Sequence, residues 1–156
     1  MDTVVEEIAN YRYVNDRLAT AGQPTEAQLR AVAAAGYEVV INLAPHEDPR
    51  SLADEAALVH SLGLSYVNIP VPFASPDSDQ LEAFFAAMQE AEQQGRRLFI
   101  HCLANKRVTA FLGLYAVLRK GQSEPAAFAL MHDVWTPNEV WTAFIQAMLA
   151  RHPRAR

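Results

Sequence analysis

The stretch RLFIHCLANKRVT, from Arg97 to Thr109, indicates the fold class of this chain. Its first five residues are mostly apolar and predict a buried strand. From Arg107 onward, apolar residues recur at helical spacing and predict a helix. These residues are Phe111, Leu112, Leu114, Tyr115 and Leu118. A strand that leads through a short loop into a helix is the repeating unit of α/β domains.

The rest of the chain repeats this alternation. Strands are predicted at 17–21, 37–43 and 65–71. Helices are predicted from a cap at Thr25 to Gly36, then over 51–62, 80–94, about 125–131 and about 137–150. The pattern predicts an α/β fold with a central, mostly parallel sheet of four to five strands flanked by helices. Because no linker or internal repeat interrupts it, we expect one domain over residues 1–156.

Composition excludes several classes of protein. The 156 residues are 51% hydrophobic and 20% charged, which is typical of a globular domain. A net charge of −5 argues against nucleic acid as a partner. No apolar run is long enough to span a membrane, so we expect no membrane association. Residues 1–7 are acidic, unlike a secretory signal, and we therefore expect a cytoplasmic protein.

Cys102 is the single cysteine, which excludes an internal disulfide and a cysteine-rich zinc site. The histidines lack the spacing of metal ligands, so neither a metal nor another cofactor is predicted. Cys102 lies between a strand end and a helix N-terminus, where backbone amides and the helix dipole attract an oxyanion and stabilise a thiolate. Two interpretations follow: a reactive nucleophile, or a small buried hydrophobic residue.

The segment from His101 to Thr109 resembles the phosphate-binding loop of cysteine-based protein tyrosine and dual-specificity phosphatases. That loop reads His-Cys, five residues, Arg, then Ser or Thr. The upstream segments Gly22–Thr25, Val40–Leu43 and Tyr66–Pro70 fit the same family in order and spacing. Over residues 10 to 150 the chain is most similar to a bacterial branch of small phosphatase-like proteins, which is related to the domain fused to β-lactamase-like hydrolases. The resemblance implies a three-layer phosphatase-like fold.

The resemblance also implies a reaction, namely hydrolysis of phosphomonoesters of the phosphotyrosine-like or dual-specificity kind through a phosphocysteine intermediate. In that reaction Cys102 attacks, Arg107 holds the equatorial oxygens and Thr109 eases departure of the thiolate. His101 is implied to be buried and to orient the loop. The remaining substrate-binding positions are Leu103, Ala104, Asn105, Lys106 and Val108. The expected partner is a phosphorylated substrate or another oxyanion, and no oligomeric state is predicted.

The loop departs from the family pattern in length. Four residues separate Cys102 from Arg107, where the family has five. Counted from the cysteine, Asn105 takes the place of a loop glycine, and asparagine tolerates the left-handed conformation required there. Either the loop is one residue shorter, or Arg107 is displaced and Val108 occupies the arginine position. Six-residue loops also occur in rhodanese-type sulfurtransferases, so a persulfide carrier is an alternative function.

A general acid is not evident. The family places an aspartate roughly thirty residues before the cysteine, and the segment Pro70–Ala74 contains no acidic residue. Asp77 is the candidate acid that we select, although it also fits a helix N-cap. The other candidates are Asp79, Glu47, Asp48 and His46. The missing acid also allows a third hypothesis, a non-catalytic module that binds phosphorylated ligands.

Overall fold

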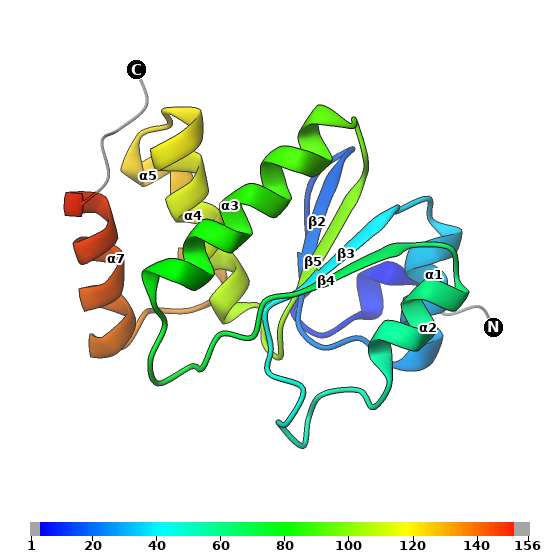
Figure 1. The fold of residues 1–156 in the computed structure, drawn as a ribbon. Helices are drawn as coiled ribbons and strands as arrows, with labels where there is room; N and C mark the ends of the chain where they lie inside the picture. The colour runs from blue at the N-terminus through cyan, green and yellow to red at the C-terminus, as the bar shows by residue number, and fades with distance from the viewer. Residues whose placement is uncertain (1–3, 152–156) are drawn as a thin grey trace.

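A five-stranded sheet runs through the middle of the molecule in the computed structural model, which describes residues 4–151 (Figure 1). Residues 1–3 of the acidic N-terminal stretch lie outside the described residues. The strand order is β1-β2-β5-β3-β4, in which only the β1–β2 pair is antiparallel. The strands are β1 (Arg12–Asn15), β2 (Leu18–Ala21), β3 (Val39–Asn42), β4 (Ser65–Asn68) and β5 (Leu98–His101). The predicted mostly parallel sheet is confirmed.

Helices cover both faces of the sheet, and each face has its own apolar core. Val40 and Phe99 point to one face, whereas Ile41 and Ile100, their neighbours along the strands, point to the other. The first face packs against η1 (Val5–Glu7), α1 (Glu26–Ala34) and α2 (Glu55–Ser61). The second packs against a larger group (Figure 1): α3 (Ser78–Gln93), α4 (Lys106–Lys120), α5 (Glu124–Ala127), α6 (Ala129–Val134) and α7 (Glu139–Arg151). This is the three-layer arrangement that the resemblance implied.

Two helix starts follow directly from the local sequence. The Thr25 side chain accepts a hydrogen bond from the backbone N–H of Gln28, and the Gln28 side chain accepts one from the backbone N–H of Thr25. Asp77 and Gln80 form the same capping box at α3. Each box satisfies two backbone donors that a helix start leaves free.

Some boundaries differ from the prediction. β1 was not predicted, because this edge strand is mostly exposed and lacks an apolar run. α2 begins at Glu55 rather than residue 51, since Asp54 before it adopts a left-handed backbone with φ 56°. β4 ends at Asn68, before Pro70, which has no N–H to donate to a ladder. The helix predicted over 125–131 is two short helices, α5 and α6.

Between residues 4 and 151 no helix is both long and apolar enough to cross a membrane.

Candidate active site

The loops that follow β5, β3 and β4 leave the same edge of the sheet and are bonded to one another. The backbone N–H of Leu43, just after β3, donates to the carbonyl of His101 at 2.9 Å. The N–H of Val71, in the loop after β4, donates to the carbonyl of Leu43 at 3.0 Å. Residues beyond the carboxyl ends of parallel strands form the usual ligand site of such sheets. Cys102 and Arg107 therefore lie where a site is expected.

The loop between β5 and α4, residues 102–105, has its carbonyl oxygens held by neighbouring groups. The carbonyls of Leu103 and Ala104 accept from the Gln23 backbone N–H at 3.0 Å and from Asn10 Nδ2 at 3.0 Å. The carbonyl of Cys102 accepts from the His101 ring, and that of Asn105 from Thr109. Carbonyls are the groups that repel an anion, so fixing them in these bonds favours an anion at the loop and at the start of α4.

Asn105 fixes the turn from this loop into α4. Its φ of 63° is left-handed, as the sequence predicted for the family's glycine position. The buried side chain donates to the carbonyl of Asn10 and to the hydroxyl of Thr20, at 2.9 Å each. On the other side of the loop, a Cβ on Gly22 would lie 2.5 Å from the carbonyl oxygen of Leu103. Only glycine allows this close approach.

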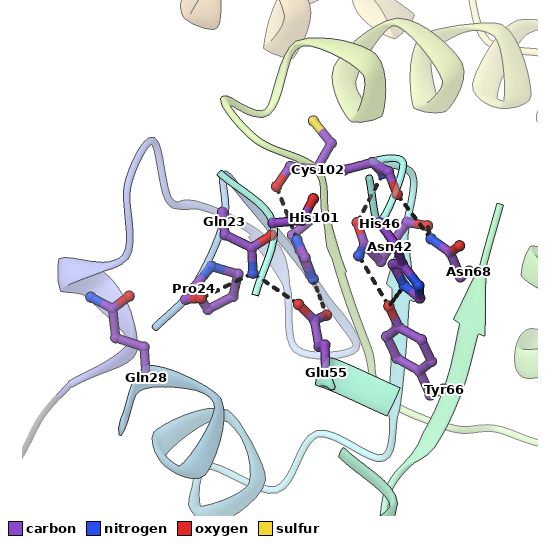
Figure 2. A network of polar contacts seen from close by, with 12 residues as sticks. Gln23, Pro24, Gln28, Asn42, His46, Glu55, Tyr66, Asn68, His101 and Cys102 are labelled. Atoms are coloured by element: carbon purple, nitrogen blue, oxygen red, sulfur yellow. Dashed lines mark hydrogen bonds and ion pairs between the residues drawn. The ribbon is translucent and has the colours of Figure 1, made fainter. Parts of the chain in front are cut away.

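Cys102 and His101 are both fully buried. The His101 ring reaches back through Nδ1 to the carbonyl of Cys102 at 3.0 Å and through Nε2 to the carboxylate of Glu55 at 2.6 Å. Gln23 donates to the other oxygen of Glu55 at 2.8 Å. In Figure 2 the sulfur of Cys102 points away from this network, so His101 and Glu55 lie on the side of the cysteine opposite to its sulfur. The buried histidine implied by the resemblance is present.

The Glu55 carboxyl is held in its charged form. Burial raises the pKa of Glu55, but the hydrogen bond and positive charge of His101 and the amide of Gln23 outweigh it, so the pKa lies below its ordinary value. A carbonyl oxygen can only accept a hydrogen bond, so His101 Nδ1 carries a proton. Because Nε2 faces an ionised carboxylate, it carries one as well. His101 and Glu55 therefore form a buried imidazolium–carboxylate pair.

Arg107 is buried at the start of α4, with 6% of its surface exposed. Its Nε donates to the carbonyl of Val71 at 2.7 Å, and its guanidinium lies 5.1 Å from the centre of the Phe73 ring. Among the described residues, the terminal Nη groups of Arg107 have no hydrogen-bond partner, and they remain available to a ligand. Val108 is fully buried in the apolar core of the second face. Its side chain therefore belongs to the core and not to the candidate anion site.

Lys106 points over two aromatic rings. Its Nζ lies 5.9 Å from the centre of Phe73 and 5.7 Å from that of Trp135. These contacts place a second positive charge beside Arg107, attracted by the faces of the rings. Phe73 belongs to the loop in which the family has its general acid. Trp141 fixes this loop by donating to the Phe73 carbonyl at 2.8 Å.

The hydroxyl of Thr109 is engaged within the protein. It donates to the carbonyl of Asn105 at 2.8 Å and accepts from Trp135 Nε1 at 3.2 Å. A hydroxyl has a single proton, and here that proton is bonded to the backbone. In this arrangement Thr109 braces the loop against α4 and anchors Trp135. To donate a hydrogen bond to the Cys102 thiolate, as the resemblance implies, the hydroxyl would have to give up its bond to the Asn105 carbonyl.

Two of the candidate acids have structural partners and two are exposed. Asp77 is the N-cap of α3, and Asp79 stands in the first turn of that helix. Asp48 forms an ion pair with Arg50 at 3.0 Å, and Glu47 is exposed. Hydrogen bonds from Arg50 lower the pKa of Asp48 to about 2, with a smaller contribution from the charge of Arg107. The low pKa of Asp48 means that this carboxyl is ionised at neutral pH and has no proton to donate.

His46 belongs to a second polar cluster, shown on the right of Figure 2. The amide oxygen of Asn42 accepts from the Ala44 backbone, so the Asn42 amide nitrogen donates to the hydroxyl of Tyr66 at 3.0 Å. Tyr66 in turn lies 2.9 Å from His46 Nε2. Burial and the nearby Glu55 carboxylate raise the pKa of Tyr66, so its hydroxyl keeps its proton. These contacts link the loop after β3 to β4.

Glu55 and Asn10 are the site residues that sequence reasoning missed. Glu55 carries one usable signal, because it shares the buried face of α2 with Val59 at helical spacing. A glutamate at a position where the period requires an apolar residue indicates a buried partner. Asn10 carries no such local signal. Its bond to Ala104 joins residues 94 positions apart.

Across residues 4–151, no three histidine, cysteine, aspartate or glutamate side chains gather in a way that could hold a metal ion.

The amino-acid sequence matches, over residues 10–116, the family described as beta-lactamase hydrolase-like protein, phosphatase-like domain. A Beta-lactamase hydrolase-like protein of Xylella fastidiosa (strain Temecula1) is 30% identical over 122 residues, which cover 76% of this chain and 28% of the relative. The protein of the same name from Agrobacterium fabrum (strain C58) is 32% identical over 97 residues, or 60% and 22% of the two chains. The chain spans about a quarter of the length of these curated relatives.

Solved structures share the fold. A candidate phosphatase from Shewanella putrefaciens CN-32 superposes with a TM-score of 0.83 at 32% identity, over 95% of this chain and 96% of that one. Tk-PTP in its active form gives 0.78 at 18% identity, over 91% and 97%. A kinase associated phosphatase gives 0.73 at 13% identity, over 87% and 89%. The last two matches show the fold alone.

Proposed function

Because the chain belongs to the beta-lactamase hydrolase-like, phosphatase-like domain family and has the phosphatase fold, we propose that it is a cysteine-dependent phosphatase acting on phosphomonoesters. Cys102 is the nucleophile, and the substrate's phosphoryl group binds at the start of α4. The hydrogen bonding of the loop between β5 and α4 is the main support for this function. Residues 102–105 have their carbonyls bonded to neighbouring groups, and within residues 4–151 the terminal nitrogens of Arg107 have no hydrogen-bond partner.

The reaction has two steps. The Cys102 thiolate attacks phosphorus, the bond between phosphorus and the ester oxygen breaks, and the leaving oxygen takes a proton from water. Water then attacks the phosphocysteine, the phosphorus–sulfur bond breaks, and inorganic phosphate and the thiolate are released. Arg107 stabilises the charge that spreads over the equatorial oxygens in both steps.

The preferred substrates in this proposal are aryl phosphates, of which phosphotyrosine is one. Asp77 caps α3 and Asp48 pairs with Arg50, so these two candidate acids have structural roles, and Asp79 and Glu47 are exposed. An aryl leaving group needs less proton donation than an alkyl one, because a phenolate is much more stable than an alkoxide.

The first experiment compares the wild type with Cys102→Ser. We expect the wild type to hydrolyse an aryl phosphate, and Cys102→Ser to bind phosphate with similar affinity while losing turnover by about a thousandfold or more. A wild type that binds phosphate tightly without turnover would contradict hydrolysis and support the non-catalytic binding module.

One observation favours the sulfurtransferase as a second candidate. The loop from Cys102 to Arg107 has six residues, and the Thr109 proton that would ease the release of sulfur from phosphorus is bonded to the Asn105 carbonyl. As a sulfurtransferase, Cys102 carries a persulfide. Incubation with thiosulfate followed by mass spectrometry distinguishes the two functions, since only a sulfurtransferase gains one stable sulfur atom on Cys102.

A further inference from the structure

We propose that Glu55 is a positioning residue for Cys102 and acts through His101. This inference rests on the proposed function, in which Cys102 is a nucleophile. Glu55 stands at the first position of α2, 46 residues before His101 in the sequence, and only 2% of it is exposed. The pair it forms with His101, at 2.6 Å, has side chains exposed by 0% and 1%. In Figure 2 the pair lies on the side of Cys102 opposite to the sulfur.

A buried ion pair of this kind needs an explanation other than stability. Removing two charges from water costs about as much as their attraction returns, and apolar side chains of similar volume stabilise a core as well or better. Glu55 also lies on the buried face of α2 together with Val59, an apolar residue of the kind that usually fills such a position. The pair instead fixes the orientation of the His101 ring and the charge that the ring carries.

The direction of the ring matters because His101 contacts the main chain of the nucleophile. Nδ1–H donates to the Cys102 carbonyl at 3.0 Å, and this bond holds that carbonyl on the side away from the sulfur. Gln23 couples the pair to the next residue of the loop. Its side chain donates to Glu55, and its backbone N–H donates to the carbonyl of Leu103.

The charge of the ring matters because His101 is next to Cys102, whereas Glu55 is bonded to the far nitrogen of the ring. The positive member of the pair is therefore the nearer one, and it favours the thiolate. Other charged or titratable groups face the same region. Lys106 and Arg107 lie on the loop side. His46 and Tyr66 lie on the Glu55 side, where the charge of His46 lowers the pKa of Glu55.

The test replaces Glu55 with glutamine, which has the same shape and no charge. The His101 ring then loses its counter-ion and keeps a single proton, so Cys102 loses the neighbouring positive charge. We expect the pH midpoint of Cys102 alkylation by iodoacetamide to rise by about one unit in Glu55→Gln. We also expect kcat to fall more than KM changes, because the anion-binding groups are retained. An unchanged midpoint in a folded variant would overturn the proposal.

Glu26→Gln is the matched control. Glu26 is also the first residue of a helix, α1, but its side chain is 63% exposed and pairs with Arg30 on the surface. The same loss of one negative charge should leave the alkylation midpoint unchanged there. An equal rise in both variants would mean that net charge alone sets the midpoint, and it would overturn the role of Glu55.

Action through His101 is tested in a second background. In His101→Asn the amide nitrogen takes the place of Nδ1 and still donates to the Cys102 carbonyl, but the ring charge is gone. Adding Glu55→Gln to this variant should produce no further rise in the midpoint. A full additional rise would show that Glu55 acts on Cys102 directly and would overturn the proposed route.

A measurement on the wild type covers the case in which these variants do not fold. Nitrogen NMR at neutral pH should show both ring nitrogens of His101 protonated, and a neutral ring would overturn the proposal. Alkylation and NMR need no turnover. A shifted midpoint in a protein without phosphatase activity would therefore refute the proposed function and leave the positioning role standing.

Discussion

The Nε of Arg107 donates to the carbonyl oxygen of Val71 at 2.7 Å, which ties the first turn of α4 to the loop after β4. This bond fixes the guanidinium at Nε, and in the described part of the chain its terminal nitrogens have no hydrogen-bond partner. Val108, the next residue, is packed in the core. Of the two interpretations of the short loop, the contacts favour the shortened loop, in which Arg107 rather than Val108 takes the arginine position.

Arg107→Lys should weaken the binding of phosphate or vanadate by about 1.5–3 kcal/mol, tenfold or more. Lysine keeps the charge but cannot bond both to Val71 and, with two nitrogens, to the anion. Isothermal titration of vanadate into the folded variant measures the change.

Lys106→Ala is the control for that titration. Lys106 is one residue away and carries the same charge, but its Nζ lies over Phe73 and Trp135. Loss of this partly screened charge should reduce affinity much less. Equal and small losses in the two variants would remove Arg107 from the role of anion clamp.

Substitution of the candidate acids should leave aryl phosphate turnover within about twofold of the wild type, because Asp77 caps α3, Asp48 pairs with Arg50 and an aryl leaving group needs little proton donation. Asp77→Asn is the sharpest case, since asparagine caps a helix as well as aspartate does and α3 should remain intact. Turnover of phosphoserine peptides should be far slower than that of aryl phosphates. Equal rates for the two substrates would reveal an acid outside this set, and assays of Asp79→Asn, Asp48→Asn and Glu47→Gln would locate any acid within it.

Thr109→Val should lower the free energy of unfolding by about 1–3 kcal/mol, because it removes a bond to the Asn105 carbonyl and leaves Trp135 Nε1 without its acceptor. Urea unfolding followed by tryptophan fluorescence gives the value. Thr109→Ser retains the hydroxyl and should cost less, about 1 kcal/mol for the lost methyl group. If valine and serine proved equally harmless, the bracing role of Thr109 would be wrong.

Stability should fall in acid partly through Glu55. The folded protein holds the pKa of Glu55 below its ordinary value of 4.5, so below about that pH the unfolded chain binds the proton more readily. The stabilisation is therefore complete above that ordinary value and is lost as the pH falls through the folded value. Glu55→Gln should unfold with a flatter pH dependence below about pH 5. Parallel curves for the two proteins would show that Glu55 is not held ionised.

Much of the fold could be predicted because its signals are local. Thr25 and Gln28 specify the start of α1 within four residues, and the apolar run that ends at His101 specifies β5. β1 escaped prediction because an exposed edge strand needs no apolar pattern. The predictable part of the fold is therefore the part that is stabilised by a periodic apolar face.

The site was only partly predictable because its contacts span long distances in the sequence. Cys102 and Arg107 could be found, since a strand, a loop and a helix start are adjacent in the chain. The partner of His101 could not be found, because Glu55 lies 46 residues away, and neither could that of Thr109, whose hydroxyl depends on Trp135. A side chain's chemistry is decided by such partners, and these emerge only when the chain is folded.

The most direct test of the account is to trap the intermediate on Cys102. The wild-type protein is mixed with an aryl phosphate, quenched in acid after a fraction of a turnover, digested and examined by mass spectrometry. A phosphocysteine mechanism predicts a phosphoryl group on the peptide that contains Cys102, formed and lost at rates consistent with turnover. Hydrolysis that proceeds without a phosphorylated Cys102 peptide, or that persists in Cys102→Ser, would contradict it.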